Sequence, residues 1–376
     1  MEFPLNEFIE LAKTKDKSQE YINSVIHYVK NLESNDFPII FTRQHWASMM
    51  QIQSTFIDYL LNDYGEDFED VLQSKYSCFT LRKRNGGERL IMAPKEDLKY
   101  LQKWIQFNIL NNYKFEDSCT GFIIGKSIKD NAKKHEFAET ILKIDLLQFF
   151  DTIKVERIYY CFKKMGYIGN VSHDFANLCT VVHPKEYWKK VDSEVKSVIG
   201  QTINSSSRVL PQGAPTSPLL ANIVASKMDK RFGGLSKKLG FNYTRYADDL
   251  TFSIKKGQKL PSLNVIYQII ESEGFYVNKK KTKFINKGCA QYVTGLTIAN
   301  GVNVNKKYRK MIERHLYFCR KYGVDNHLNK NKKTLFGFNR LSFHDWLYGH
   351  ICYIKSINEN CYKKLIEEYK KITWTI

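Results

Sequence analysis

The feature that most constrains the fold of this chain is the run from Thr244 to Phe252, in which two adjacent aspartates interrupt residues typical of strands. Aromatic, β-branched and aliphatic side chains flank Asp248 and Asp249 on both sides, a pattern that predicts two strands joined by a turn. Successive side chains on a strand point to opposite faces, so a tight turn is needed to bring both carboxylates to one site. The run therefore predicts a β-hairpin with two carboxylates at its end.

Two carboxylates at such close range repel each other unless a cation neutralises them or one of them takes up a proton. Hard divalent cations with oxygen ligands, Mg²⁺ above all, suit a site of this kind. On a basic chain, this pattern favours two-metal phosphoryl transfer on a nucleic acid. The alternative is an Asp-Asp turn without a metal, because aspartate is also common in turns for local reasons.

Asp145 is the third carboxylate that we expect in this site. It lies in the short strand predicted from Ile141 to Leu146, where a buried charge is costly without a cation. The alternative is a strand-end aspartate that caps the following turn. Slightly further along, Asp151 stands at what resembles a helix start, and we expect it to be the N-cap.

The charge balance indicates a polyanionic partner. The chain has 376 residues, with 58 Lys and Arg against 39 Asp and Glu, and a formal charge of +19. Such an excess favours salt-sensitive binding by counterion release, with solubility as the alternative explanation.

The compartment follows from what the sequence lacks. The eight cysteines form no Cys-x-x-Cys pair, no apolar run is long enough to span a membrane, and the N-terminus has no signal-peptide pattern. We therefore expect a cytoplasmic protein without a membrane partner, with its cysteines as free thiols.

The hydrophobic periodicity predicts an α+β fold with one core sheet and helices around it. Helical spacing occurs over residues 1–74, 95–112 and from Lys306 onward. Strand patterns occur over residues 77–94, 141–146, 243–254 and 291–298. We expect Ser217 to cap a helix with Pro218 at its first position, and the basic stretch 326–333 to be a loop.

Several polar side chains are placed to hold a nucleotide. Lys83 and Arg89 flank the Gly-containing turn of the first predicted hairpin, and Arg89 can bind a triphosphate in bidentate fashion. Gln212 lies in a Pro-rich loop, where Gly213 permits close backbone approach. Phe150 is a candidate wall of a sugar site. The alternatives are an exposed basic hairpin and a core phenylalanine.

Together these motifs resemble those of reverse transcriptases. Tyr246-Ala247-Asp248-Asp249 looks like the catalytic box of that family, and four further motifs occur in the family's order between about residues 75 and 300. These are Arg82-Lys83-Arg84-Asn85-Gly86-Gly87-Glu88-Arg89, Asp145-Leu146-Leu147-Gln148-Phe149-Phe150-Asp151, Leu210-Pro211-Gln212-Gly213-Ala214-Pro215-Thr216-Ser217-Pro218 and Asn278-Lys279-Lys280-Lys281-Thr282.

Two shorter motifs narrow the resemblance to bacterial retron reverse transcriptases. Asn131-Ala132-Lys133-Lys134-His135 is similar to their Asn-Ala-x-x-His motif, and Val293-Thr294-Gly295 is similar to their Val-Thr-Gly motif. The alternative for His135 is an ordinary histidine on a helix surface. We expect an RNA-binding role for Asn131, His135, Val293, Thr294 and Gly295.

The resemblance implies a right-hand polymerase with fingers, a palm of antiparallel sheet plus helices, and a helical thumb. The regions expected are an N-terminal helical region over 1–74, fingers over 75–143, a palm over 144–300 and a basic thumb over 301–376. A further fingers segment, about 154–207, interrupts the palm.

The resemblance also implies roles for single residues. Asp145, Asp248 and Asp249 are expected to hold two Mg²⁺ ions, with the backbone carbonyl of Leu146 as a further ligand. Deoxynucleoside triphosphates are the expected substrates, held by Lys83, Arg89 and Gln212. Phe150 is expected to exclude the ribose 2′-hydroxyl, and Lys281 to assist the leaving pyrophosphate as an acid.

Retron enzymes are implied to copy part of a cognate structured non-coding RNA into short DNA, primed from an RNA 2′-hydroxyl and left branched to the RNA. Antiphage defence with a separate effector protein is implied as well. A basic cluster on the thumb is expected to bind an RNA stem. The alternative is that these residues form a solvated helix face. The cluster includes Lys306, Lys307, Arg309, Lys310 and Arg314.

Three other functions stay open at this point. The first is a reverse transcriptase of a different bacterial group, defence-associated or intron-derived. The second is an RNA-binding scaffold with a vestigial site, although all three aspartates, the Gln212 loop and the Lys83/Arg89 pair are intact. The third is a nucleotidyl cyclase with a related palm, which would not need a basic thumb.

Overall fold

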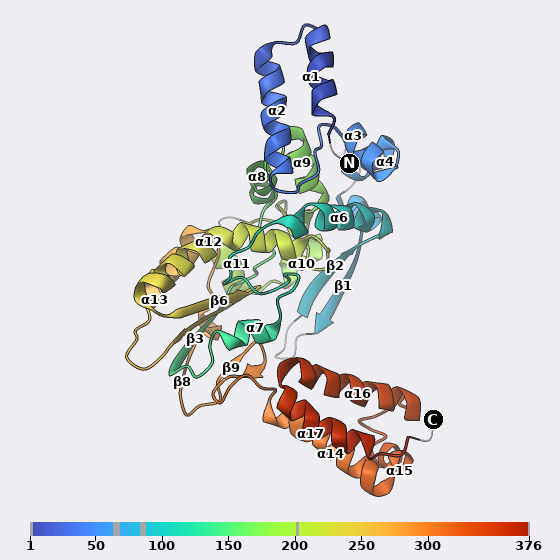
Figure 1. Ribbon diagram of the computed structural model, residues 1–376, viewed down its shortest axis with the longest axis vertical. Helices are drawn as coiled ribbons and strands as arrows, with labels where there is room; N and C mark the ends of the chain where they lie inside the picture. Colours follow the sequence, from blue (N-terminus) through green and yellow to red (C-terminus); the bar gives the residue numbers. More distant parts are fainter. Residues whose placement is uncertain (1–2, 63–67, 83–87, 201–202, 375–376) are drawn as a thin grey trace.

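A four-stranded antiparallel sheet forms the centre of the molecule, with strand order β6-β7-β3-β8 (Figure 1). The computed structural model describes residues 3–62, 68–82, 88–200 and 203–374. The central strands are β3 (Thr140–Asp145), β6 (Asn242–Tyr246), β7 (Asp249–Ile254) and β8 (Lys283–Asn286). The mixture of this sheet with many helices confirms the α+β class predicted from the sequence.

Alternation along the strands gives this sheet one apolar face and one polar face. Leu142, Ile144, Leu250 and Phe252 are fully buried on the apolar face. Helix α12 (Ser217–Leu239) covers it and places the ring of Phe232 5.1 Å from that of Phe252. Helices α8 (Val155–Met165), α9 (Gly169–Leu178) and α13 (Leu263–Ser272) complete this layer. The polar face, by register, has Lys143 and Asp145 on β3 beside Thr251 and Asp249 on β7.

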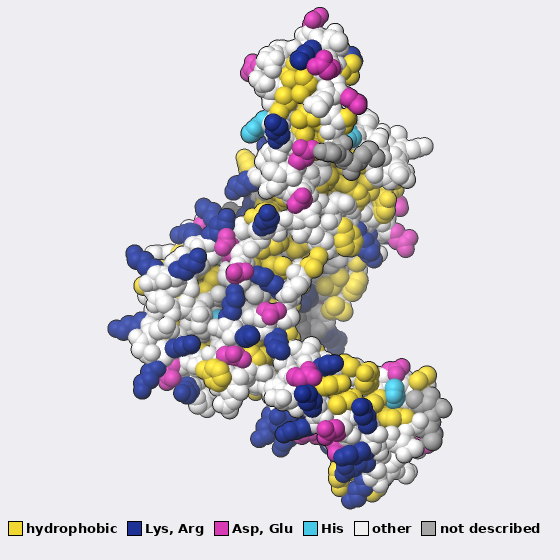
Figure 2. Space-filling view, in the orientation of Figure 1, with side chains coloured by type: hydrophobic (Ala, Val, Ile, Leu, Met, Phe, Trp, Pro, Cys, Tyr) yellow, Lys and Arg dark blue, Asp and Glu magenta, His cyan; other side chains and the backbone are white. Residues whose placement is uncertain are grey.

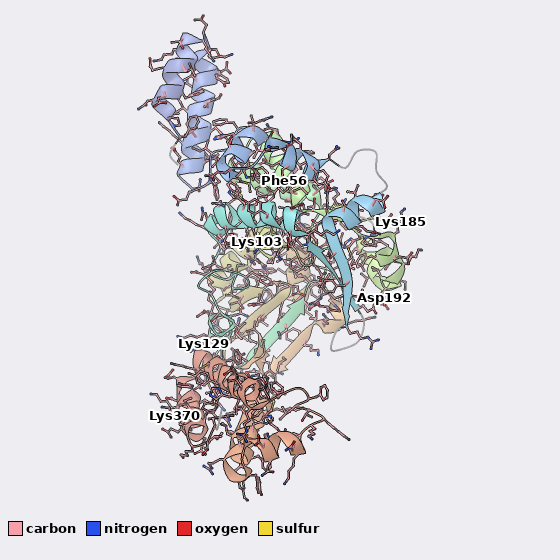
Figure 3. All side chains as sticks on the ribbon, turned by 90° about the vertical axis from the view of Figure 1, so that its right-hand side faces the viewer. Phe56, Lys103, Lys129, Lys185, Asp192 and Lys370 are labelled. Atoms are coloured by element: carbon pink, nitrogen blue, oxygen red, sulfur yellow. The ribbon has the colours of Figure 1, made fainter. Side chains whose placement is uncertain are left out.

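The fingers are built around a long hairpin, β1 (Tyr76–Arg82) and β2 (Glu88–Pro94), followed by α6 (Glu96–Asn108) and the short η1 (Leu110–Asn112). The segment between the first palm strand and α12 adds β4 (Val181–Val182), α10 (Lys185–Lys190), α11 (Ser193–Ile199) and β5 (Arg208–Val209). Figure 3 shows this segment, marked by Lys185 and Asp192, beside the β1–β2 hairpin.

The N-terminal region is helical, as the periodicity predicts. Its helices are α1 (Leu5–Thr14), α2 (Gln19–Glu33), α3 (Arg43–Met50), α4 (Ser54–Leu61) and α5 (Phe68–Lys75). The α1–α2 pair projects from the body of the molecule (Figure 1), whereas α3 is anchored to it by Trp46, whose ring lies 5.0 Å from that of Phe175.

The C-terminal helices form a separate lobe with its own core (Figure 1). The helices are α14 (Lys306–Tyr322), α15 (Val324–Lys330), α16 (Arg340–Ile357) and α17 (Glu359–Lys370). This core continues into α7 (Ile128–Lys133) and the hairpin β9 (Tyr292–Val293) and β10 (Leu296–Thr297), which join the lobe to the palm sheet. Among the described residues, no helix is both long enough and apolar enough to cross a membrane.

Three local predictions need correction. Helix α8 begins at Val155, so Asp151 is not the N-cap of this helix. The carboxylate of Asp151 is buried in the interior instead. Helix α12 begins at Ser217 with Thr216 as its N-cap, one residue earlier than predicted. Most of the stretch predicted as a loop, residues 326–333, belongs to α15, because His327 is buried against α14.

Candidate active site

Three aspartates meet at one end of the palm sheet. The antiparallel register of β3 and β7 places Asp145 directly opposite Asp249, on the polar face. Asp248 lies in the two-residue turn between β6 and β7, and its carbonyl accepts a hydrogen bond from the amide of Leu146 at 2.9 Å. The fold thus brings together the three carboxylates that the sequence predicts, with Leu146 directly beside them.

Two lysines lie against these carboxylates. The ammonium of Lys143 donates to Asp249 at 2.8 Å, and that of Lys281 donates to both oxygens of Asp145 at 2.9 and 3.0 Å. Burial raises the pKa of Asp248 above its ordinary value, and the charge of Asp145 adds to this effect. Burial likewise raises the pKa of Asp249, although Lys143 opposes the rise. The site is therefore a partly buried acidic cluster that needs positive charge nearby.

The chemistry of the donors fits hard divalent cations, which prefer carboxylate oxygens. Across the described ranges, however, no three carboxylate, histidine or cysteine side chains are grouped closely enough to hold a metal ion. Asp145 and Asp249 are instead each paired with a lysine. A metal ion would therefore take the place of these lysines at the carboxylates.

A buried arginine, Arg245, stabilises the turn that contains Asp248. Arg245, fully buried on β6, donates two bonds to the carboxylate of Asp229 and one to the amide oxygen of Asn222. It also donates to the carbonyl of Ala247 at 3.2 Å and to the sulfur of Cys119. All five guanidinium N–H groups thus have an acceptor, and one acceptor belongs to the turn itself.

The backbone of this turn is unusual as well. Ala247 has a φ of 55°, a left-handed conformation that is unfavourable for an alanine. Gly121 lies so close that an added Cβ would stand 2.9 Å from the amide nitrogen of Ala247. The turn therefore depends on its surroundings for its shape.

The residues expected at the nucleotide have different surroundings. Phe150 is half-buried beside Phe149, with the ring centroids 5.4 Å apart. Gln212 is held by its side chain, which donates to Asp151 at 3.4 Å, and by its carbonyl, which accepts from the amide of Met92 at 2.8 Å. Gln212 therefore lies where palm and fingers meet.

Of the basic residues expected in the first hairpin, the structure describes Arg89. Arg89 is exposed on β2, opposite Leu81 in the register of the hairpin. Lys83 lies outside the described residues. Lys281, by contrast, is in direct contact with Asp145 through η2 (Lys279–Lys281), so the site already includes one of the expected nucleotide contacts.

The Asn-Ala-x-x-His segment lies in the interior, which corrects the prediction of a surface histidine. His135 is fully buried in the turn after α7, with its two ring nitrogens 2.7 Å from the hydroxyls of Ser253 and Thr244. Burial lowers its pKa to about 3, so the ring is neutral. Asn131 is 1% exposed. Both side chains are covered because α7 folds back onto the polar face of the sheet, so neither faces a surface where RNA could bind.

The Val-Thr-Gly motif forms the tight turn of the β9–β10 hairpin. Val293 is buried opposite Leu296, whereas Thr294 and Gly295 have φ values of 47° and 82°. Two consecutive positive φ angles are typical of the type I′ turns that close two-residue hairpins. The hydroxyl of Thr294 donates to the carbonyl of Ile128 at 3.0 Å, so this turn contacts the start of α7, the helix that carries Asn131. Direct RNA contact by Thr294 and Gly295 remains a prediction.

The basic cluster of the thumb is accessible. Lys306, Lys307, Lys310 and Arg314 are exposed on α14, whereas Arg309 is half-buried and paired with Glu313 at 3.2 Å. Figure 2 shows lysine and arginine side chains over this lobe and over the adjoining palm. The distribution provides a basic surface for a polyanion, as the charge balance predicts.

Sequence reasoning missed four residues of this region. Lys143 stands two positions before Asp145, so strand alternation alone indicated that both share a face. Arg245 lies in the strand before the Asp248 turn, where its neighbours Tyr243 and Thr244 favour a strand and a buried charged residue needs a partner. Tyr187 and His183, which contact Asp151, had no recognisable local signal.

The chain resembles one described protein family over most of its length. Residues 81–339 match the family described as "Reverse transcriptase (RNA-dependent DNA polymerase)". Among solved structures, a telomerase from Candida albicans in complex with a fragment of telomeric RNA is 15% identical. That similarity covers 88% of this chain and 69% of that chain, with a TM-score of 0.38.

The similar curated proteins include several reverse transcriptases of bacterial retrons. The retron Mx162 enzyme of Myxococcus xanthus is 36% identical over 59% of this chain, and the retron Mx65 enzyme of the same organism is 34% identical over 64%. The chain spans about half the length of these two relatives, 47% and 55%. The retron Ec86 enzyme of Escherichia coli is 28% identical over 95% of both chains.

Proposed function

Because the chain belongs to the reverse transcriptase family, among the retron reverse transcriptases of bacteria, we propose that it is an RNA-directed DNA polymerase that acts at the site of Asp145, Asp248 and Asp249. The observation that supports this most directly is the register that sets Asp145 opposite Asp249, beside the Asp248 turn. Three partly buried carboxylates at one place, two of which (Asp248 and Asp249) have raised pKa values, have few structural uses, because their mutual repulsion destabilises the fold.

The three carboxylates and the carbonyl of Leu146 would hold two Mg²⁺ ions. When bound, such ions lower the pKa of the attacking hydroxyl and neutralise the triphosphate and the leaving pyrophosphate. Lys281, which lies 2.9 Å from Asp145, would move from the carboxylate to the pyrophosphate and protonate it. Lys143 keeps positive charge at Asp249 from the opposite side.

The deoxynucleoside triphosphate would be bound between palm and fingers. Arg89 and Lys83 supply positive charge from the first hairpin, and Gln212 supplies a carboxamide to the sugar or base. Phe150 lies in the connection between β3 and α8, five residues after Asp145, and its ring would exclude a ribose 2′-hydroxyl from the sugar position.

The RNA partner follows from the retron relatives. We propose that the enzyme copies part of a cognate structured non-coding RNA into short single-stranded DNA, primed from an RNA 2′-hydroxyl and left branched. The exposed basic side chains of α14 support binding of an RNA stem through its phosphates. A bacterial cytoplasmic location and a separate effector protein in antiphage defence complete this proposal.

The first experiment is to express the chain with its native flanking locus and to sequence the nucleic acid that copurifies. A double variant, Asp248→Asn with Asp249→Asn, serves as the control. We expect short DNA that is released from RNA by a 2′–5′ debranching enzyme and is missing from the control. Unbranched DNA that still depends on the aspartates would place the chain in another reverse transcriptase group.

A second measurement tests the site directly. Asp248→Asn is expected to reduce primer extension by several orders of magnitude, because a metal ligand is lost, while RNA binding remains nearly unchanged. DNA synthesis at wild-type rates by this variant would refute the assignment of the site. Absence of DNA from the wild type under all conditions would favour an RNA-binding scaffold instead.

A further inference from the structure

Two side chains of the segment between β4 and β5 contact Asp151, in the connection after β3. Tyr187, on α10, donates its hydroxyl proton to Asp151 at 2.7 Å, and Nε2 of His183 lies 3.2 Å from the same carboxylate. The two rings stack with centroids 4.1 Å apart and planes 12° apart. This pair therefore acts as one unit against the carboxylate of Asp151.

Asp151 is buried, and three donors converge on it. Its side chain is 3% exposed, and the third donor is the carboxamide of Gln212 at 3.4 Å. The hydroxyl of Tyr187 in turn accepts a hydrogen bond from Gln148 at 3.1 Å. The network thus runs from the loop after β3, through Tyr187 and Asp151, to Gln212.

This network decides which way the Gln212 carboxamide points. An ionised carboxylate only accepts hydrogen bonds, so Asp151 faces the Nε2 end of the amide rather than its oxygen. The carbonyl oxygen Oε1 is then left to accept a bond from another group. The main chain of Gln212 is held separately, by the amide of Met92 on β2, so the remaining freedom of this residue is in its side chain.

We propose that Tyr187 and Asp151 are positioning residues that orient the Gln212 carboxamide toward the incoming deoxynucleotide. The segment between β4 and β5 would thereby contribute to nucleotide affinity without touching the nucleotide. This inference rests on the proposed role of Gln212 as a nucleotide contact.

A purely structural role would look different. The pairing of His183 with Asp151 already satisfies one carboxylate oxygen, and the apolar parts of Tyr187 pack equally well without a hydroxyl. The hydroxyl instead hydrogen-bonds to Gln148 and Asp151. These residues lie two positions before and one position after Phe150 in the sequence. The hydrogen-bond network ends at Gln212, the residue of the Pro-rich loop whose carboxamide is expected to contact the nucleotide.

The test is steady-state primer extension on an RNA template by the full chain, with kcat and the KM for deoxynucleotide measured separately. Tyr187→Phe removes only the hydroxyl, and so releases the shortest of the three bonds to Asp151. We expect the KM to rise about fivefold with kcat changed less than about twofold, since the Gln212 carboxamide is then held less firmly for nucleotide binding in the ground state. Tyr160→Phe, on an exposed tyrosine of α8, is the matched control and should change neither value.

A double-mutant cycle separates this inference from the proposed function. Gln212→Ala alone should raise the KM, and Tyr187→Phe should have no further effect in that background, because both act through one contact. An equal effect of Tyr187→Phe in both backgrounds, or an unchanged KM in the single variant, would overturn the positioning role. If Gln212→Ala leaves the KM unchanged, the nucleotide contact itself is wrong and the inference falls with it. Equal melting temperatures for all variants confirm that folding is not the cause.

Discussion

Lys143 and Asp145 are two residues apart on β3, so both side chains lie on the polar face of the palm sheet. This spacing gives the acidic cluster a permanent cation on the strand itself, 2.8 Å from Asp249. The pair is about a quarter exposed, so solvent weakens it, but the lysine still competes with any metal ion for the same carboxylate. A metal ion bound here would therefore share the carboxylates with the lysine.

This competition leads to a prediction about metal affinity. Lys143→Met keeps the length of the side chain and removes its charge, so we expect Mn²⁺ to bind about threefold more tightly. The measurement is calorimetric or paramagnetic titration of Mn²⁺ in the absence of nucleic acid. Lys283→Met, on the neighbouring β8, is a control with an exposed lysine. Weaker binding to the Lys143 variant would show that the lysine supports the metal site instead.

Phe150 is the second residue whose role can be tested by itself. Replacement by alanine opens the space beside the sugar, so ribonucleotides should be incorporated more readily, by about tenfold or more relative to deoxynucleotides. Competition between the two nucleotide types in primer extension gives this ratio directly. Unchanged sugar discrimination would refute the gate and leave Phe150 as a packing residue next to Phe149.

At the scale of elements, α7 and the β9–β10 hairpin are the joint between palm and thumb. Thr294 ties the hairpin to α7, and His135 ties the turn after α7 to strands β6 and β7. Buried residues of both elements belong to the same core as α14 and α16. The two short retron motifs therefore hold the base of the thumb, whatever contacts their exposed atoms make with RNA.

The buried histidine of this joint predicts acid sensitivity. The pKa of His135 is about 3 in the folded chain and about 6.5 in an unfolded one, so between these values only the unfolded chain takes up the proton. Stability is then complete above pH 6.5 and is lost as the pH falls through this window. From pH 7.5 to pH 5 the loss from this group is about 2 kcal/mol.

Urea unfolding at both pH values measures this loss. In His135→Gln the group no longer titrates, so the free energy of unfolding should fall by about 2 kcal/mol less than in the wild type over the same range. His315, buried beside His327 in the thumb with a pKa lowered to about 4, adds acid sensitivity that both proteins share. Equal pH dependence in the two proteins would contradict the burial of a neutral His135.

At the scale of the whole molecule, the net charge of +19 and the exposed lysines and arginines of α14 predict how RNA binding responds to salt. Each lost phosphate contact should reduce the slope of log affinity against log salt by about one. For Lys310→Ala with Arg314→Ala we expect a slope smaller by about two, measured by fluorescence anisotropy with a structured RNA. Lys13→Ala, on the projecting α1, is the control. An unchanged slope would mean that this face of the thumb does not meet the phosphates.

The sequence by itself determined the local features of this protein. The hairpin around Asp248 and Asp249, the helical N-terminal and C-terminal regions and the first hairpin all depend on residues a few positions apart, whose periodicity and turn preferences are visible in the chain. The order of the polymerase motifs identified the family in the same way, and the family match over residues 81–339 confirms it.

Only the tertiary structure decided which distant residues meet. The pairing of β3 with β7, and with it the position of Asp145 opposite Asp249, results from packing of the whole sheet against α12. The sequence did not predict the burial of His135 or the hydrogen bond between Asp151 and Tyr187 for the same reason. A polar side chain looks alike in sequence whether its partner is water or a hydroxyl from a remote strand, because burial is a property of the assembled core rather than of the local chain.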